Sequence, residues 1–570
     1  MNEPLTIRTE RVDDIPLLLA QMQRMGIAGL LDEHFPTHGN REGLSLGELT
    51  IIWLTHVLSE ADHRMNRVQP WAERRLETLR GCSAESLEVR DLADDRLAEV
   101  LRHLSDDEYW RAFEQELTGQ LVRVYDLRAD CVRLDSTTAS SYGAVSEDGL
   151  LQLGHSKDHR PVLPQLKVML ATLDPLGMPL ATEVLSGERA DDPLYLPAIA
   201  RVRACLNSVG LLYVGNCKMA ALDTRASIQA AGDFYLCPLS ALQVSADQLA
   251  RELAALRKSS QPLLTVERRG ADGQTRCIAH GYECSQTITA QLEGGASTWT
   301  ERRLLVRSQV AARAAETALR TRLGQALADL VLRRQGKPVP TSQAAVEQAV
   351  AETVAHFRVE GLLTVTVSEQ LSEQPVRAYG NRPATVRTQR QFTISSEVDP
   401  EALSNAIAQL GWRVYATNQG ADELSLPQAV QAYRDEYLVE RNFGRLKGHP
   451  LSLSPMYVER DDHATGLVRL VSIALRVLTL LEFVVRRQLA QEEASLAGLY
   501  AGNPKRATTH PTTERLLEAF QEITLTMVIE PHQTRRHVTA LSALQQRVLA
   551  LLEFTPVIST KLCGDSSEPP

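Results

Sequence analysis

The stretch Tyr433-Arg-Asp-Glu-Tyr-Leu-Val-Glu440-Arg-Asn-Phe-Gly-Arg-Leu-Lys447 decides how the rest of the chain is interpreted, because it places acids and bases at helical spacing. Ser425 and Gln428 form a capping-box pattern with Pro427 in the first turn, which predicts one helix from there to about residue 448. Four of its side chains are spaced to share one face: Glu436, Glu440, Phe443 and Lys447. A carboxylate and an ammonium two turns apart can hold a metal ion and a phosphate.

The composition is that of a globular protein, with 570 residues, 44% hydrophobic and 23% charged. A net charge of -10 argues against a wholly basic surface, although DNA binding needs only a local basic face. The most apolar segment, residues 467–485, contains Arg469, Arg476 and Glu482, which are costly in lipid. We therefore expect a buried helix and no membrane association. The N-terminus lacks a signal-peptide pattern, which predicts a cytoplasmic location.

The eight cysteines are scattered singly, without the paired spacing of a disulfide scaffold or a zinc ribbon. Cys277, His280 and Cys284 are close enough in sequence to suggest a metal site, but the pattern offers no fourth ligand for a tetrahedral zinc ion. Reduced, mostly structural thiols are expected.

The order of predicted elements indicates an α/β protein. Helical spacing dominates the first 125 residues, for example over residues 46–58 and 98–121. The pattern then changes, and the segments that follow are, in order, strands at 131–138, 166–173 and 178–185, a helix ending near 206, a strand at 211–215, a helix at 219–231 and a strand at 233–238. Asp135 and Asn216 each stand at the end of a strand.

Later segments suggest an insertion into this core. After about residue 241 long helices such as 309–334 mix with β-rich pieces, and a core-like strand returns at 411–417. Helices are predicted at 467–488 and over 513–554. The resulting division is 1–125, an all-α N-terminal DNA-binding region; 126–240, the first part of the core; 241–400, an inserted α+β domain; 401–490, the second part of the core; and 491–570, a C-terminal helical region.

Asp135, Asn216 and Glu440, in that order, resemble the acidic constellation of the DDE insertion-sequence transposases. The resemblance covers about residues 126–488 and is to the class with a large β-rich insertion between the second and third acids. Its third motif is Tyr-x2-Arg-x3-Glu-x6-Lys, matched here by Tyr433, Glu440 and Lys447. The resemblance implies an RNase H-like catalytic core, a mixed sheet flanked by helices, with an inserted β-rich and helical domain.

Two positions depart from the family pattern. Glu436 stands where the third motif usually has Arg, and Arg434 is the candidate to take over that phosphate contact. Asn216 stands where the family has the second acid. The resemblance implies two Mg²⁺ ions per site, with Mn²⁺ possible, held by Asp135, Asn216 and Glu440. An amide supplies no negative charge, so catalysis should be severely reduced.

The resemblance also implies DNA contacts. The candidates are Lys447, Tyr433, Arg434, Arg441, Arg445, Lys157 and Arg160. By its location Trp299 resembles the aromatic residue that stacks on a flipped base near the cleaved end. The alternatives are a Trp packed in the insertion's own core, an exposed turn around Lys157 and Arg160, and helix-surface ion pairs for Arg441 and Arg445.

The implied function is a DNA transposase that binds terminal inverted repeats and target DNA, both double-stranded. It would catalyse Mg-dependent strand cleavage and transfer as a homodimer on paired ends. Two alternatives remain open at this stage. One is a catalytically inactive, transposase-derived DNA-binding protein, consistent with Asn216; the other is a structure-specific nuclease on the same core.

Overall fold

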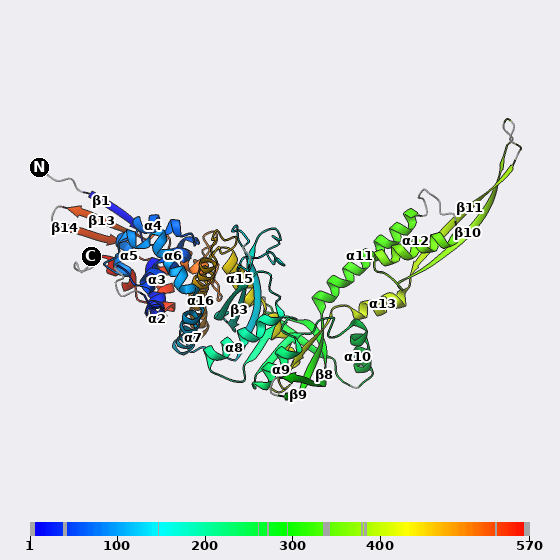
Figure 1. The fold of residues 1–570 in the computed structure, drawn as a ribbon, viewed down its shortest axis with the longest axis horizontal. Helices are drawn as coiled ribbons and strands as arrows, with labels where there is room; N and C mark the ends of the chain where they lie inside the picture. Colours follow the sequence, from blue (N-terminus) through cyan, green and yellow to red (C-terminus); the bar gives the residue numbers. More distant parts are fainter. Residues whose placement is uncertain are drawn as a thin grey trace. The chain divides into compact units, whose positions relative to one another are not determined.

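The computed structural model describes residues 6–37, 43–145, 148–259, 261–270, 273–292, 295–333, 342–377, 380, 383, 385–530 and 533–563. The chain forms two compact units. Unit 1 comprises residues 1–237, 289–299 and 432–570; unit 2 comprises 238–288 and 300–431. The five sequence-based boundaries remain predictions, but the α/β class is confirmed (Figure 1).

Five strands of unit 1 lie in the order β4-β3-β2-β5-β6. Their bounds are β2 Cys131–Ser140, β3 Gln165–Leu173, β4 Met178–Ser186, β5 Leu212–Gly215 and β6 Phe234–Pro238. The first three form an antiparallel meander, whereas β2, β5 and β6 run parallel. The parallel strands follow the helices α8 Tyr195–Leu206 and α9 Leu222–Ala230, since parallel pairing needs a long crossover. This is the mixed sheet of the predicted RNase H-like core.

One long helix, α16 Asp461–Gln491, forms the centre of unit 1. It packs most extensively on α6 Asp94–Ser105, and a Cβ on its Gly466 would lie 2.1 Å from the Leu101 carbonyl oxygen, so only glycine permits this approach. The buried Arg476 donates to Glu114 at 2.6 Å. The predicted buried helix is therefore confirmed, and its arginine is tolerated inside the protein because it is paired.

The N-terminal region is helical but for one strand, β1 Thr6–Arg11. Its helices are α1 Ile15–Arg24, α2 Ile27–His34, α3 Leu46–Glu60, α4 Met65–Glu73, α5 Leu76–Cys82, η1 Val89–Leu92, α6 and α7 Asp107–Val124. The helical spacing over 98–121 is divided between two helices, because Asp106 caps the second by accepting from the N–H groups of Glu108 and Tyr109.

The C-terminal region corrects the helical prediction for 513–554. Only its ends are helical, as α17 Thr513–Glu518 and α18 Ala543–Leu551, followed by α19 Val557–Thr560 and η3 Lys561–Cys563. Between them β13 Thr524–Glu530 and β14 Gln533–Val538 pair with each other, and β13 pairs with β1 (Figure 1). The β-branched residues of β13 favour a strand, but its partner β1 comes from the far end of the sequence.

Four further strands, which belong mostly to unit 2, have the order β12-β9-β8-β7. Their bounds are β7 Leu264–Arg269, β8 Thr275–Leu292, β9 Gly295–Ser308 and β12 Trp412–Thr417. Helix α10 Ala246–Lys258 covers them through a cluster of Val244, Leu253, Leu305 and Val414. The predicted strand at 411–417 is present as β12.

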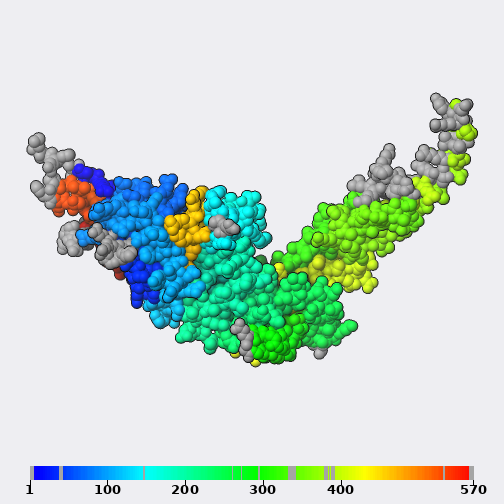
Figure 2. Space-filling view, in the orientation of Figure 1, coloured from blue at the N-terminus to red at the C-terminus, as the bar shows by residue number. Residues whose placement is uncertain are grey.

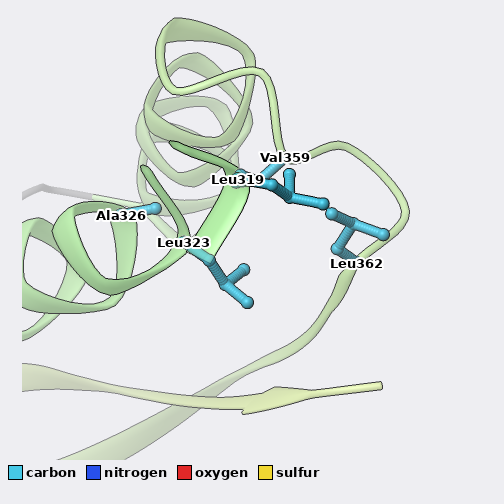
Figure 3. Close-up of a cluster of buried hydrophobic side chains, with 5 residues drawn as sticks. All are labelled: Leu319, Leu323, Ala326, Val359 and Leu362. Atoms are coloured by element: carbon cyan, nitrogen blue, oxygen red, sulfur yellow. The ribbon is translucent and has the colours of Figure 1, made fainter. Parts of the chain in front are cut away.

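The rest of unit 2 is a helical pair packed on a two-stranded ribbon. Helices α11 Gln309–Arg333 and α12 Gln343–His356 contact the ribbon strands β10 Leu363–Val376 and β11 Thr385–Val398, and α13 Pro400–Gln409 follows. A buried cluster of five residues joins α11 to the turn after α12 (Figure 3): Leu319, Leu323, Ala326, Val359 and Leu362. The helices thereby cover one face of a ribbon that would be marginal alone.

No helix within the described ranges is both long and apolar enough to cross a membrane.

On the face of unit 1 drawn in Figure 2, the gold segment after residue 450 is exposed between the blue N-terminal helices and the cyan segment after β2. There the rings of Tyr142 and Tyr457 lie 5.3 Å apart.

Candidate active site

The parallel pairing of β2 with β5 brings Asp135 and Asn216 together. Leu134 pairs with Gly215, so the next residue of each strand lies at the same edge. The Asn216 Nδ2 atom donates to Asp135 Oδ1 at 3.0 Å. Asp135 does not end its strand as predicted, because β2 continues to Ser140 in pairing with β3.

The Asn216 side chain is used on both sides. While its Nδ2 donates to Asp135, its Oδ1 accepts from the Lys218 backbone N–H at 2.8 Å. The amide oxygen therefore closes a local turn, and the uncharged amide N–H group donates a hydrogen bond to the neighbouring Asp135 carboxyl. An aspartate at this position could still accept from the Lys218 N–H, but it has no N–H group to donate to Asp135.

Burial raises the pKa of Asp135, and the negative charge of Asp191 adds to the rise, while Lys157 and the Asn216 amide oppose it. Asp191 follows β4 and was not anticipated from the sequence. Burial also raises the pKa of Asp191, but the Lys167 hydrogen bond and the Lys157 charge outweigh burial and make the net shift downward. The site therefore holds a deprotonated Asp191 beside an Asp135 whose charge is disfavoured.

The predicted single helix over 425–448 is two helices, α14 Leu426–Arg434 and α15 Tyr437–Lys447. The capping box at Ser425 is present, with Ser425 N donating to Gln428 Oε1 at 2.9 Å. The break at Asp435 makes Glu436 the residue that precedes α15. The four residues expected on one face therefore have different surroundings: Glu440 is exposed and Phe443 is buried.

Glu436, not Glu440, lines a small cavity together with Asp135, Gly215 and Tyr433. Burial raises the pKa of Glu436, and the negative charges of Asp135 and Glu440 raise it further. Tyr433 opposes the rise through a hydrogen bond to the carboxyl. The sequence signal for Glu436 was its place in the third motif, where an acid replaces the usual Arg. The catalytic role of Glu440 stays a prediction.

Tyr195 is a further residue that the sequence did not reveal. Its ring is fully buried, and a Cβ on Gly215 would lie 3.3 Å from it. Within the described chain its hydroxyl has no hydrogen-bond partner. Burial raises the pKa of this hydroxyl, and the charges of Asp135 and Asp191 add to that rise. Tyr195 is thus a buried, protonated phenol beside Gly215.

Two predicted phosphate-binding lysines lie along β2. Lys447 Nζ donates to Thr137 Oγ1 at 2.9 Å and to Asp158 Oδ1 at 2.5 Å. Lys157 Nζ donates to the Ser136 carbonyl oxygen at 2.6 Å and to its hydroxyl at 2.9 Å. Lys447 therefore links β2 to the end of α15, and Lys157 links β2 to the loop that follows it. Both side chains are partly exposed.

The two predicted arginines on α15 are structural, which favours the ion-pair alternative. Arg445 is 5% exposed and donates to Glu482 at 2.6 Å and to Glu514 at 2.7 Å. Arg441 also pairs with Glu482. Arg160 lies exposed beyond Lys157, so its DNA contact stays a prediction.

Three other predicted DNA contacts have varied surroundings. Trp299 is 6% exposed and its Nε1 donates to the Tyr235 hydroxyl at 2.9 Å, so the ring is packed inside the protein and its base-stacking role stays a prediction. Tyr433 is buried against Glu436, which removes its ring from the surface. Arg434 is half-buried at the end of α14, and its role stays a prediction.

The donor set bears on the expected magnesium ions. Among the described residues no group of three or more His, Cys, Asp or Glu side chains is arranged to hold a metal ion. Asp135 and Glu436 nevertheless line one cavity, and each carries a pKa raised by burial with added repulsion from nearby negative charge. A cation would relieve that repulsion. The residues thus fit one divalent cation but lack the third carboxylate expected for a pair.

Comparison with known proteins gives little guidance. No family model matches the chain, and no curated protein matches it. A solved structure that it resembles is a synaptic complex of the piggyBac transposase with hairpin DNA. That match has a TM-score of 0.35 and 8% sequence identity, and it covers 97% of this chain and 86% of the other. Similarity this low carries no conclusion about activity.

Proposed function

We propose that the chain is a DNA transposase of the DDE type in which Asn216 leaves a weakened, single-cation site. The observation that carries this proposal is the side-by-side placement of Asp135 and Asn216 on an RNase H-ordered sheet, with Glu436 beside them. The third motif, with Lys447 bound to the hydroxyl-rich strand β2, supports it. Terminal inverted repeats, target DNA and a homodimer on paired ends belong to the same proposal.

In this proposal Asp135 and Glu436 hold one Mg²⁺ or Mn²⁺ ion, with Glu440 one turn further along α15. A bound divalent ion supplies an activated nucleophile and stabilises negative charge on a phosphate. Lys157 and Lys447 are placed to bind phosphate oxygens as point charges. The Asn216 amide orients Asp135 without adding to the charge that attracts the ion.

The test compares the parent with Asn216→Asp for nicking of a supercoiled plasmid in Mg²⁺ or Mn²⁺, alongside binding of a fluorescent DNA duplex. We expect both proteins to bind the duplex and the variant to nick about a hundredfold faster, since an added acidic ligand restores charge at the ion. Adding Glu436→Gln or Glu440→Gln to the variant then identifies the third acid. If neither protein binds DNA, the proposal fails.

One alternative has its own structural support. Because both ends of the Asn216 amide are hydrogen bonded within the chain, the site is stable without a cation, as an inactive DNA-binding protein requires. That function would be indicated by duplex binding in both proteins and nicking in neither. Nicking without joining of a supplied 3′-end to target DNA would instead indicate a nuclease.

A further inference from the structure

A cysteine and a histidine lie side by side on β8 in unit 2. Cys277 Sγ is 3.5 Å from His280 Nε2. The same thiol lies 3.5 Å from the Ala279 carbonyl oxygen, so two acceptors face its proton. Both side chains are partly exposed, which leaves the sulfur within reach of a small molecule.

A β-bulge accounts for this placement. In a regular strand, residues three apart point to opposite faces of the sheet. In the pairing of β7 with β8, Val266 faces Ala279 whereas Glu267 faces Cys277, so one extra residue is inserted on β8. The insertion turns Cys277 onto the face that carries His280, an effect for which bulges are known.

Two further groups complete the surroundings of the thiol. His280 Nδ1 lies 3.4 Å from Thr265 Oγ1 on β7, which orients the ring. Gln309, the first residue of α11, donates from Nε2 to Cys277 Sγ at 3.1 Å. The same Nε2 lies 3.5 Å from His280 Nε2. The thiol thus faces an imidazole that can receive its proton and an amide that donates to its sulfur.

We propose that Cys277 is a nucleophilic modification site that reacts with soft electrophiles, in particular with low-molecular-weight disulfides. The thiol proton passes to His280 Nε2, and the thiolate attacks one sulfur of the disulfide. A mixed disulfide forms at Cys277 as the original S–S bond breaks, and the departing thiolate takes up a proton. Cys277 is oxidised and one half of the disulfide is reduced to a thiol.

The modification has a structural consequence within unit 2. A bulky group on Cys277 cannot share the space with the Gln309 amide, so it displaces the first residue of α11. A zinc ion is a poorer occupant, because the pair provides two of the four side chains that a structural site needs. The proposal is independent of the transposase assignment.

Alkylation by iodoacetamide at pH 7, quantified for each cysteine by mass spectrometry, tests the proposal on the full chain. Cys217 is the matched internal control, since it is the cysteine classed as exposed. We expect Cys277 to react about tenfold faster than Cys217 despite lower exposure, because His280 Nε2 is placed to take the thiol proton as the sulfur attacks. His280→Gln should abolish that advantage while the rate of Cys217 stays unchanged.

Two further variants keep the test decisive. Thr265→Val removes the hydroxyl beside the ring, and Gln309→Ala removes the amide donor; each should slow Cys277 by a few-fold. Incubation with oxidised glutathione should add one glutathione at Cys277 before any other site. Equal rates for Cys277 and Cys217 in the parent, or an unchanged Cys277 rate in a folded His280→Gln protein, would overturn the proposal.

Discussion

The two ends of α15 carry charges of opposite sign, and only the charge at the C-terminal end is matched by ion pairs. At its N-terminal end Glu436 lies close to other negative charge, and the pKa of its carboxyl is raised after burial by Asp135 and Glu440. At its C-terminal end Arg445 is matched by Glu482 and Glu514. Like charges that lie close together without a cation indicate a binding site, whereas charges that are fully paired belong to the fold.

The largest expected effect is at the paired end. Arg445→Ala removes the buried cation shared by Glu482 and Glu514, although Arg441 and Arg486 still pair with Glu482. We expect the free energy of unfolding to fall by about 3 kcal/mol. Urea denaturation measures the loss. Glu440→Ala on the exposed side of the same helix is the control, expected within about 0.5 kcal/mol. Similar losses of unfolding free energy in the two variants would contradict the proposed difference between the two ends of α15.

The next effect is at the acid end. Asn216→Asp replaces a hydrogen-bond donor to Asp135 by a second negative charge, so the folded protein should lose about 1 to 3 kcal/mol without divalent cations. Mg²⁺ or Mn²⁺ should restore this loss in the variant more than in the parent. Thermal unfolding with and without 10 mM metal chloride (about ten thousand times a micromolar dissociation constant) reports both changes. An equal metal response in the two proteins would argue against a cation beside Asp135.

A smaller effect is expected at Lys447. Lys447→Met removes a charge-assisted bond to Asp158, but Asp158 also accepts from Ser140 at 3.2 Å and from Ser454 at 3.0 Å. We expect a loss of about 1 kcal/mol in the free energy of unfolding and a larger loss in DNA affinity. Fluorescence anisotropy with duplex DNA checks the second part. Unchanged DNA affinity would assign Lys447 to the fold alone.

The smallest effect is a pH dependence from Glu436. Its pKa in the folded protein is raised above the ordinary 4.5, so the folded state binds that proton more tightly than the unfolded state does. Stability should therefore fall as pH rises from 4.5 through the raised pKa. Glu436→Gln should lessen this fall in urea titrations between about pH 4 and 7. If the free energy of unfolding changed with pH equally in parent and variant, the Glu436 carboxyl would not be subject to this repulsion.

Much of the core could be predicted from local patterns. Short apolar strands separated by helices indicate parallel pairing, and that pairing alone places Asp135 beside Asn216. The capping box at Ser425 also marks where a helix begins. These features depend on residues close in sequence or on strand direction, which alternation and turn residues reveal.

The remaining features depend on tertiary contacts. The sequence at the break before Glu436 contains no Gly or Pro, so no residue there predicts that the helix is interrupted. The neutralisation of Arg445 depends on Glu482 and Glu514, which approach only when α16 and α17 pack beside α15. Trp299 was judged by its polar neighbours in sequence, but its burial follows from contact with Tyr235.

The small sheet of β1, β13 and β14 constrains how the protein is made. Arg11 of β1 pairs with Thr524 of β13, its partner strand much later in the chain. Since ribosomes add roughly 5 to 20 residues per second, β1 waits on the order of a minute for its partner. During that interval its edge is open to other strands, so synthesis itself, rather than the finished fold, is when this segment most needs a chaperone.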